Sequence, residues 1–183
     1  MGAMIILVGA SASGKTEIAK CLASNYGIKK AITHTSREKR GGEKDGVDYF
    51  FVPEAIFLQM KSRYCFVETT CYNGHYYGCS KDQVADDKCV VVDPNGLKAF
   101  KALKSKRVIS FLLRADEETR IERMRKRGDK EEEIAKRLEN DKEAFAMSNV
   151  MQADFIIDTD SRTVEAIAKQ IYALYKAELK KLS

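Results

Sequence analysis

The sequence predicts an α/β fold in which helices cover both faces of a parallel sheet. Short apolar runs, of the kind that form buried strands, alternate along the chain with segments of helical periodicity, and this alternation is typical of parallel sheets. The first apolar run leads directly into a glycine-rich loop and then into a helical segment. The length of 183 residues suits one sizeable domain, and no linker or low-complexity stretch divides it.

The expected core elements follow in chain order. A buried strand is expected over residues 4–8 and a helix over residues 15–24. Further strands are expected where short apolar runs recur, over residues 89–92, 108–113 and 155–157, with residues 32–35 as an additional candidate. Helical patterns lie over residues 95–103, 116–127, 131–149 and 163–182. The last of these presents one apolar face that predicts core packing: Val164, Ile167, Ala168, Ile171, Tyr172 and Tyr175.

Residues 33–80 break this alternation and predict a small β-rich insertion. Residues 48–52 are typical of a strand, and Pro53 suits the start of a short helix. Residues 64–79 predict strands on either side of Asn73 and Gly74, a dipeptide that strongly favours a tight hairpin. An insertion just after the first helix can fold over a second substrate.

The glycine-rich loop carries the most specific motif in the chain. It fits the pattern G-x-x-x-x-G-K-[ST] of a phosphate-binding P-loop and consists of Gly9, Ala10, Ser11, Ala12, Ser13, Gly14, Lys15 and Thr16. The glycines let successive backbone N–H groups point at phosphate oxygens, and the helix that follows adds the positive end of its dipole. Lys15 is expected to reach the β- and γ-phosphates of a nucleoside triphosphate, and Thr16 to ligate Mg²⁺. A simple glycine turn is the alternative, but the flanking strand and helix favour nucleotide binding.

The composition excludes several classes of protein. No apolar run approaches the roughly 18 residues that a membrane helix needs, so no membrane partner is expected. The five cysteines form no C-x-x-C pair, which argues against a zinc or disulfide framework and predicts a reducing, cytoplasmic setting. The net charge of +5 suits anionic small molecules. Because the basic residues gather around motifs rather than along one stripe, no nucleic-acid partner is expected.

A second group of polar residues lies in the insertion. Arg37 and Arg40, three residues apart, can hold one phosphate from two sides, because guanidinium matches phosphate geometry. Tyr49 and Tyr77 offer hydroxyl groups to the same oxygens. Glu68, between apolar neighbours, can accept two N–H bonds from the Watson–Crick edge of guanine, whereas adenine has no such donor pair. The alternatives are a solvated charged loop for the arginines and a charge that blunts a sheet edge for Glu68.

Taken together, these motifs resemble those of the guanylate kinases, P-loop enzymes that phosphorylate GMP with ATP. The family's T-x-R-x-x-R-x-G-E-x-x-G-x-D-Y block is similar to residues 35–49, and its G-x-Y-Y-G block to residues 74–78. The resemblance implies a P-loop NTPase-type core over residues 1–32 and 81–183, with residues 33–80 binding GMP. It further implies that the GMP phosphate is held by Thr33, Arg37, Arg40, Tyr49 and Tyr77, and that Glu68 selects guanine.

The resemblance also implies a mobile helical lid over about residues 123–140. Arg123, Arg127 and Arg137 lie on either side of residues 128–133, and in the family such arginines act with the P-loop lysine on the transferring phosphoryl group. Phosphoryl transfer depends mainly on positioning and electrostatics, so arginines suit this role. A charged helix pair with ion pairs one turn apart is the alternative.

Three features depart from the family pattern. Cys79 stands where a Ser or Thr usually bonds the guanine base, and a thiol is a poor donor. Val91 replaces the first acidic residue of a D-x-D pair, which leaves Asp93 as a contact to the nucleotide or a second candidate ligand for Mg²⁺. The segment between Arg127 and Arg137 is about one residue short.

These departures keep other functions open. One alternative is a related P-loop kinase that acts on another nucleotide or on a sugar phosphate. Another is a non-catalytic module that binds a phosphorylated peptide with the same arginines. The leading expectation is an ATP:GMP phosphotransferase that uses ATP and Mg²⁺, as a monomer or a homodimer.

Overall fold

The main sheet of the computed structural model is parallel, as the alternating sequence pattern predicts. The structure describes residues 2–72, 74–103, 107–146 and 153–181. Five strands form this sheet in the order β2-β7-β1-β8-β9, and every pair of neighbours is parallel. The strands are β1 (Met4–Gly9), β2 (Lys29–Lys30), β7 (Lys88–Val92), β8 (Val108–Arg114) and β9 (Phe155–Asp158).

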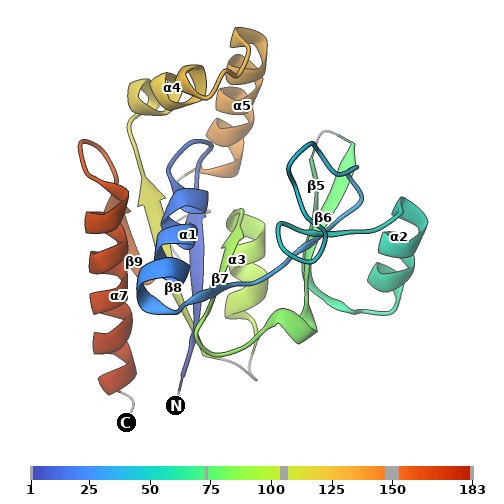
Figure 1. Cartoon of the computed structure of the whole chain (residues 1–183), viewed down its shortest axis with the longest axis horizontal. Helices are drawn as coiled ribbons and strands as arrows, with labels where there is room; N and C mark the ends of the chain where they lie inside the picture. Colours follow the sequence, from blue (N-terminus) through green and yellow to red (C-terminus); the bar gives the residue numbers. More distant parts are fainter. Residues whose placement is uncertain (1, 73, 104–106, 147–152, 182–183) are drawn as a thin grey trace.

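Helices cover both faces of this sheet and complete a three-layer α/β/α core. On one face lie α1 (Lys15–Tyr26) and α7 (Val164–Lys180), and on the other α3 (Pro94–Lys101), as Figure 1 shows. Side chains of β1 alternate between the two faces: Ile5 and Leu7 pack with α1 and α7, whereas Ile6 packs with Leu97 of α3. The predicted apolar face of the last helix is confirmed, since Ile171 is fully buried in the first of these clusters.

The insertion forms a second sheet beside the first (Figure 1). Its order is β4-β3-β6-β5, with β3 (His34–Thr35), β4 (Phe50–Phe51), β5 (Phe66–Tyr72) and β6 (His75–Ser80). The helix α2 (Glu54–Ser62) packs on this sheet through Phe57, whose ring stacks on that of Phe66 at 4.6 Å. Gly78 is required here, because a Cβ at this position would lie 2.9 Å from the Glu68 carbonyl oxygen and 3.1 Å from Phe57.

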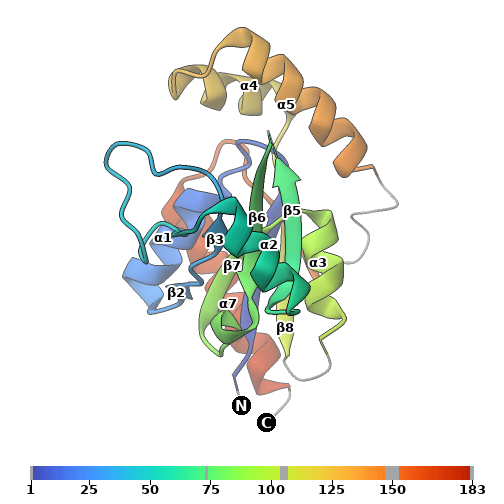
Figure 2. The same ribbon diagram turned by 90° about the vertical axis from the view of Figure 1, so that its right-hand side faces the viewer.

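Two further helices lie across the carboxyl end of the main sheet. They are α4 (Glu117–Lys126) and α5 (Glu131–Ala144), and Figures 1 and 2 show them above the loop that joins β1 to α1. A single 3-10 turn, η1 (Lys81–Gln83), leads from the second sheet back to the core. No helix in the described ranges is long and apolar enough to cross a bilayer.

Several element boundaries differ from the prediction. The strand predicted over residues 48–52 shrinks to Phe50–Phe51, because Asp45 and Asp48 accept hydrogen bonds from backbone N–H groups of Phe51 and Lys44 and so favour turns. The candidate strand over residues 32–35 shrinks to β3 (His34–Thr35) in the second sheet. Lys29–Lys30, just before that range, form β2 in the main sheet, so the chain crosses between the two sheets here. The helix expected from Pro53 begins at Glu54, with Pro53 as its N-cap. Asn73 of the hairpin turn and the ends of the helices predicted over 131–149 and 163–182 lie outside the described residues.

Candidate active site

The loop after β1 has the geometry of a phosphate cradle. Gly9 ends β1 at a point where a Cβ would lie 2.6 Å from both the Leu113 carbonyl oxygen and Ser13 Oγ, so only glycine fits. Gly14 adopts φ 96° and Ala12 φ 59°, which bends the backbone sharply before α1 begins at Lys15. This curvature turns backbone N–H groups inward at the amino end of a helix, the arrangement that binds anions.

Lys15 folds back over this loop. Its Nζ donates hydrogen bonds to the carbonyl oxygens of Gly9 at 2.5 Å and Ala10 at 2.8 Å. Burial lowers the pKa of Lys15 to about 8, and the nearby Asp141 carboxylate opposes part of this shift. A buried ammonium held by neutral carbonyls gains most from an anion placed beside it, so this loop fits a phosphate group.

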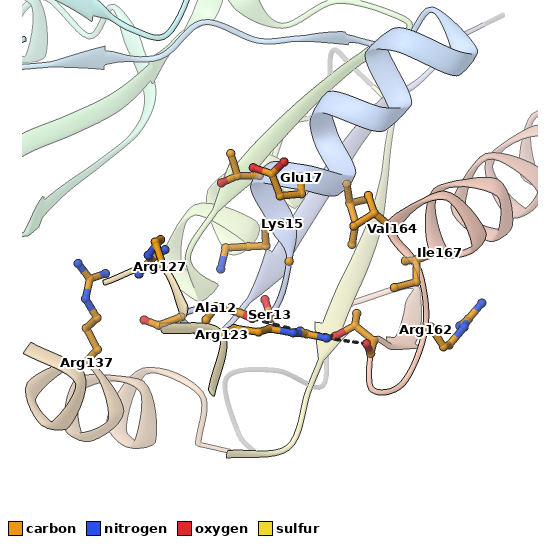
Figure 3. Close-up of a pocket in the computed structure, with 15 residues that line it drawn as sticks. Ala12, Ser13, Lys15, Glu17, Arg123, Arg127, Arg137, Arg162, Val164 and Ile167 are labelled. Carbon is orange, nitrogen blue, oxygen red and sulfur yellow. Dashed lines mark hydrogen bonds between the residues drawn. The ribbon is translucent and has the colours of Figure 1, made fainter. Parts of the chain in front are cut away.

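A first cavity of about 520 Å³ opens from this loop. Its walls come from the loop, α1, the two helices above and the start of α7 (Figure 3), and include Ser11, Ala12, Ser13, Gly14, Lys15, Thr16, Arg123, Arg127, Arg137, Arg162, Val164 and Ile167. All three arginines that the sequence singled out therefore lie at one cavity. The structure thus brings the predicted lid residues and the P-loop together.

The three arginines differ in what they contact. Arg123 joins the P-loop to the end of the main sheet, because its guanidinium donates to the Ala12 carbonyl oxygen at 3.2 Å and to the Thr159 carbonyl oxygen at 2.8 Å. Arg127 is paired with Asp129, and Arg137 approaches the same carboxylate at 3.9 Å. Arg127 and Arg137 lie on one side of Lys15 in Figure 3. Arg127 and Arg137 thus lie near the loop, whereas Arg123 connects the loop to Thr159 at the end of the sheet.

A second cavity of about 520 Å³ lies between the loop and the second sheet. Its walls contain most of the residues expected to bind the acceptor, namely Thr33, Arg37, Arg40, Tyr49, Glu68, Tyr77 and Asp93. Ser11, Lys15 and Arg137 line both cavities. The two cavities therefore meet at the P-loop.

Arg37 is held in place rather than solvated. Its guanidinium contacts Glu43 at 2.7 Å, and only 11% of its side chain is exposed. The same guanidinium lies 5.7 Å from the centre of the Tyr49 ring. Glu43 also accepts a hydrogen bond from the backbone N–H of Arg40 at 2.8 Å, which orders the loop between the two arginines. These contacts argue against a freely solvated charged loop, at least for Arg37.

Glu68 faces the second cavity although its strand lies at the edge of the sheet. One carboxylate oxygen accepts a hydrogen bond from the backbone N–H of Cys79 at 2.9 Å. Burial, helped by the charge of Asp93, raises the pKa of Glu68 to about 7. Glu68 is therefore partly buried and faces a cavity, whereas a charge that only protects a sheet edge would face bulk solvent.

Cys79 does not line either cavity. Its side chain is fully buried and packs in the core cluster that includes Ile6, Val90 and Leu97. Its backbone N–H donates to Glu68, which lines the second cavity. The residue thus acts on the cavity through its main chain in this structure, whereas direct contact by the thiol was expected from its position in the sequence.

Asp93 has a structural contact in addition to its place in the second cavity. It is the N-cap of α3, and its Oδ1 accepts a hydrogen bond from the Gly96 N–H at 2.7 Å. Within the described ranges, no group of three or more His, Cys, Asp or Glu residues could hold a metal ion. Mg²⁺ characteristically takes few protein ligands and completes its shell with phosphates and water, so Thr16 at the loop suits it.

Asp141 and Arg120 are residues of this site that the sequence did not reveal. Asp141 of α5 accepts hydrogen bonds from the Ser11 backbone N–H at 2.9 Å and from Arg120 of α4 at 2.7 Å. Asp141 lies one helical turn after Arg137, and spacing of this kind places two residues on the same helix face. That spacing was the available signal, but the sequence does not show that this face meets the loop.

Comparison with known proteins agrees with the geometry. The family model described as guanylate kinase matches residues 1–178. The chain belongs to the guanylate kinase family. Members of this family are nucleoside monophosphate kinases that transfer phosphate from ATP to GMP.

Two relatives indicate how much of the chain the likeness covers. A guanylate kinase from Nitrosococcus oceani is 34% identical over 166 residues, which cover 87% of this chain and 81% of that protein. A guanylate kinase from Syntrophus aciditrophicus is 31% identical over 189 residues, covering 100% of this chain and 89% of that protein. The similarity to guanylate kinases therefore extends through core and insertion alike.

Solved structures support the same fold. The crystal structure of guanylate kinase from Anaplasma phagocytophilum has a TM-score of 0.70 and 26% sequence identity, and the match covers 97% of this chain and 86% of that chain. A shikimate kinase from Acinetobacter baumannii, in complex with shikimate, has a TM-score of 0.57 at 13% identity, with 97% and 95% of the two chains covered. The second likeness concerns the fold alone. Both confirm the predicted P-loop type of α/β core.

Proposed function

We propose that this chain transfers the γ-phosphate of ATP to GMP and produces ADP and GDP. The observation that carries this proposal is the junction of the two cavities: Lys15 and Arg137 line both of them. One cavity contains the phosphate-binding loop, and the other contains the residues suited to a guanine nucleotide. A direct transfer between two nucleotides needs such a junction, because the reacting atoms must come within about 3–3.5 Å of each other.

ATP is proposed to bind along the P-loop in the first cavity. The loop backbone surrounds its phosphates with N–H groups other than that of Ser11, which donates to Asp141. Lys15 contacts the β- and γ-phosphates, and the Thr16 hydroxyl would hold Mg²⁺. When bound there, Mg²⁺ would supply positive charge that offsets the negative charge developing on the phosphates during transfer. The carbonyl-bound position of Lys15 is consistent with this role, since its ammonium already lies at the loop.

GMP is proposed to bind in the second cavity, with the insertion over residues 33–80 as its binding unit. The Glu68 carboxylate accepts hydrogen bonds from the guanine ring N–H and amino group. Thr33, Arg37, Arg40, Tyr49 and Tyr77 bind the phosphate, and Asp93 contacts the nucleotide. Arg37 is already oriented by Glu43, so binding costs it little side-chain entropy.

Catalysis in this proposal rests on positioning and charge. The helices over residues 123–140 act as a lid that brings Arg127 and Arg137 to the phosphoryl group and excludes water. Arg123 holds the P-loop against the end of the sheet. The transfer passes through a loose transition state with spread charge, so no strong base is required.

The alternatives receive less support from the site. A sugar phosphate lacks the adjacent ring N–H and amino donors of guanine, which match the two oxygens of a carboxylate such as Glu68. A phosphopeptide-binding module does not need the loop, Lys15 and three arginines assembled at one cavity. The burial of the Cys79 thiol also removes the main reason to expect an unusual base, because the thiol does not reach the cavity wall.

An acceptor series tests the proposal. ADP release from ATP is measured with GMP, dGMP, AMP, UMP, CMP and ribose 5-phosphate at equal concentrations. GMP and dGMP should support rapid release, and AMP should not, because it lacks the two donors that Glu68 recognises. Release that is fastest with AMP or with ribose 5-phosphate would overturn the proposed acceptor, and phosphopeptide binding without any release would favour the module.

A further inference from the structure

A buried ion pair connects the two upper helices to the P-loop. Arg120 of α4 and Asp141 of α5 lie 2.7 Å apart, with only 10% and 12% of their side chains exposed. The same carboxylate accepts a hydrogen bond from the Ser11 backbone N–H at 2.9 Å, and its other oxygen lies 3.2 Å from Ser11 Oγ. Asp141 of α5 thus contacts two other elements of the fold at once, the P-loop and α4.

Asp141 and its partner Arg120 both reach the P-loop at Ser11. The Ser11 amide belongs to the phosphate-binding loop, and Arg120 also reaches the Ser11 carbonyl oxygen at 3.5 Å. The N–H group of Ser11 therefore bonds to α5, and its carbonyl oxygen to α4. A paired, hydrogen-bonded carboxylate at such a site is costly to disrupt, since the remaining charge would be buried alone.

Asp141 also has a fixed relation to the proposed catalytic arginine. Arg137 lies one turn earlier on α5, and both residues line the second cavity. Residues one turn apart on a helix share a face and move as a unit. Whatever holds Asp141 against Ser11 therefore also sets the distance between Arg137 and the P-loop.

We propose that Asp141 is a positioning residue that docks α5 onto the P-loop and thereby places Arg137 at the transferring phosphoryl group. This inference rests on the proposed function. Asp141 acts through Arg137 and does not touch the reacting atoms. Arg120 supports it by neutralising and orienting the carboxylate.

The competing explanation is that the ion pair only stabilises the fold. A double-mutant cycle separates the two, because a residue that acts through Arg137 loses its effect when Arg137 is absent. The variants are Asp141→Ala, Arg137→Ala and the two combined. Asp158→Ala is the matched control, since Asp158 is paired with Arg114 on the exposed surface at 2.9 Å.

The expected result is a fall in kcat of about 10²-fold for Asp141→Ala, the size typical of a displaced catalytic group. The KM for GMP should change much less than kcat, because most of the proposed GMP-binding residues lie in the insertion over residues 33–80. In the Arg137→Ala background, Asp141→Ala should have little further effect. Asp141→Asn, which keeps an oxygen for the Ser11 N–H, should retain more of the kcat than Asp141→Ala.

A second readout does not depend on activity. Hydrogen exchange of the Ser11 amide is measured by NMR in the protein without nucleotide, and Asp141→Ala should speed it up while Asp158→Ala leaves it unchanged. If Asp141→Ala fails to fold, the apolar pair Arg120→Met with Asp141→Leu replaces it, since buried ion pairs are often exchanged for apolar residues without loss of stability.

The outcomes separate this inference from the proposed function. Equal losses of kcat for Asp141→Ala in both backgrounds, or unchanged Ser11 exchange, would overturn the positioning role. A wild-type protein that transfers no phosphate to GMP would overturn the proposed function, while the exchange experiment would still decide whether Asp141 docks α5 onto the loop.

Discussion

The Glu68 carboxylate accepts a hydrogen bond from the backbone N–H of Cys79 at 2.9 Å across the hairpin of β5 and β6. This contact holds a partly buried acidic group at the wall of the second cavity. The pKa of Glu68 is nevertheless raised to about 7, because burial outweighs the hydrogen bond. The proposed guanine-recognition group is therefore expected to titrate near neutral pH, and this has consequences for both binding and stability.

The affinity for GMP should increase as the pH rises through 7. Below that pH Glu68 is protonated and cannot accept two N–H bonds from guanine, whereas above it the carboxylate is available. The KM for GMP, measured between pH 6 and pH 8, should fall with increasing pH. GMP has its own phosphate ionisation near pH 6, so Glu68→Gln is the control and should lack the component near pH 7.

The free energy of unfolding should depend on pH in the opposite direction: ionisation of Glu68 favours GMP binding but lowers the stability of the fold. A carboxyl group with a raised folded-state pKa contributes stability below its unfolded value of 4.5, and this contribution is lost as the pH rises through about 7. Glu68→Gln should therefore stabilise the protein at pH 8 by about 1–3 kcal/mol relative to its effect at pH 4. Urea unfolding at the two pH values measures this difference. An equal effect of Glu68→Gln at the two pH values would mean that the pKa of Glu68 is the same in the folded and unfolded states.

Lys15→Ala should reduce kcat by at least about 10²-fold, the size seen when one preorganised donor to a transition-state charge is removed. Its folding should be unaffected or improved, because the variant removes a buried amine whose pKa is lowered to about 8. Lys20→Ala on the same helix is the control, since Lys20 is exposed and paired with the exposed Glu17. Steady-state rates and thermal unfolding are measured for both. Near wild-type turnover in Lys15→Ala would contradict the assignment of the loop.

Arg37→Ala should raise the KM for GMP by about 10- to 100-fold, as expected for the loss of a charge-assisted hydrogen bond to phosphate. The KM for ATP should change much less, because Arg37 does not line the first cavity. Arg114→Ala, an exposed arginine paired with Asp158, serves as the control. If both KM values rose together, Arg37 would be needed for the fold and not for GMP.

Cys79→Ser should leave the preference for GMP over AMP nearly unchanged. The side chain is fully buried in an apolar cluster and does not reach the cavity wall. The variant should instead lose about 1–3 kcal/mol of stability, because a hydroxyl is placed among apolar neighbours. Relative rates with the two nucleotides and urea unfolding test both parts. A large gain in preference for GMP would show that the residue at position 79 contacts the base.

The sequence was sufficient for features that depend on local spacing. The P-loop is defined by neighbouring residues, and the structure places Gly9, Gly14 and Lys15 with the expected bends and contacts. The core strands and helices also follow from short-range periodicity, which does not depend on distant contacts.

Tertiary contacts explain what the sequence did not reveal. Asp141 meets Ser11 across 130 positions in the chain, and no local pattern indicates that pairing. The burial of Cys79 depends on how the second sheet packs against α3 and β7. The shortened strand at Phe50–Phe51 results from competition between aspartate side chains and the sheet for the same N–H groups, and strand propensity does not include this effect.

The most direct test of the two-substrate site is a single-turnover reaction with ATP labelled in its γ-phosphate. Enzyme in excess is mixed with labelled ATP and GMP, and the products are separated at successive times. The account predicts that the label appears in GDP. Arg137→Ala should slow this transfer by about 10³-fold or more, because Arg137 is proposed to stabilise the charge of the transferring phosphoryl group. Label that appears in inorganic phosphate, or that remains in ATP while GMP is bound, would contradict it.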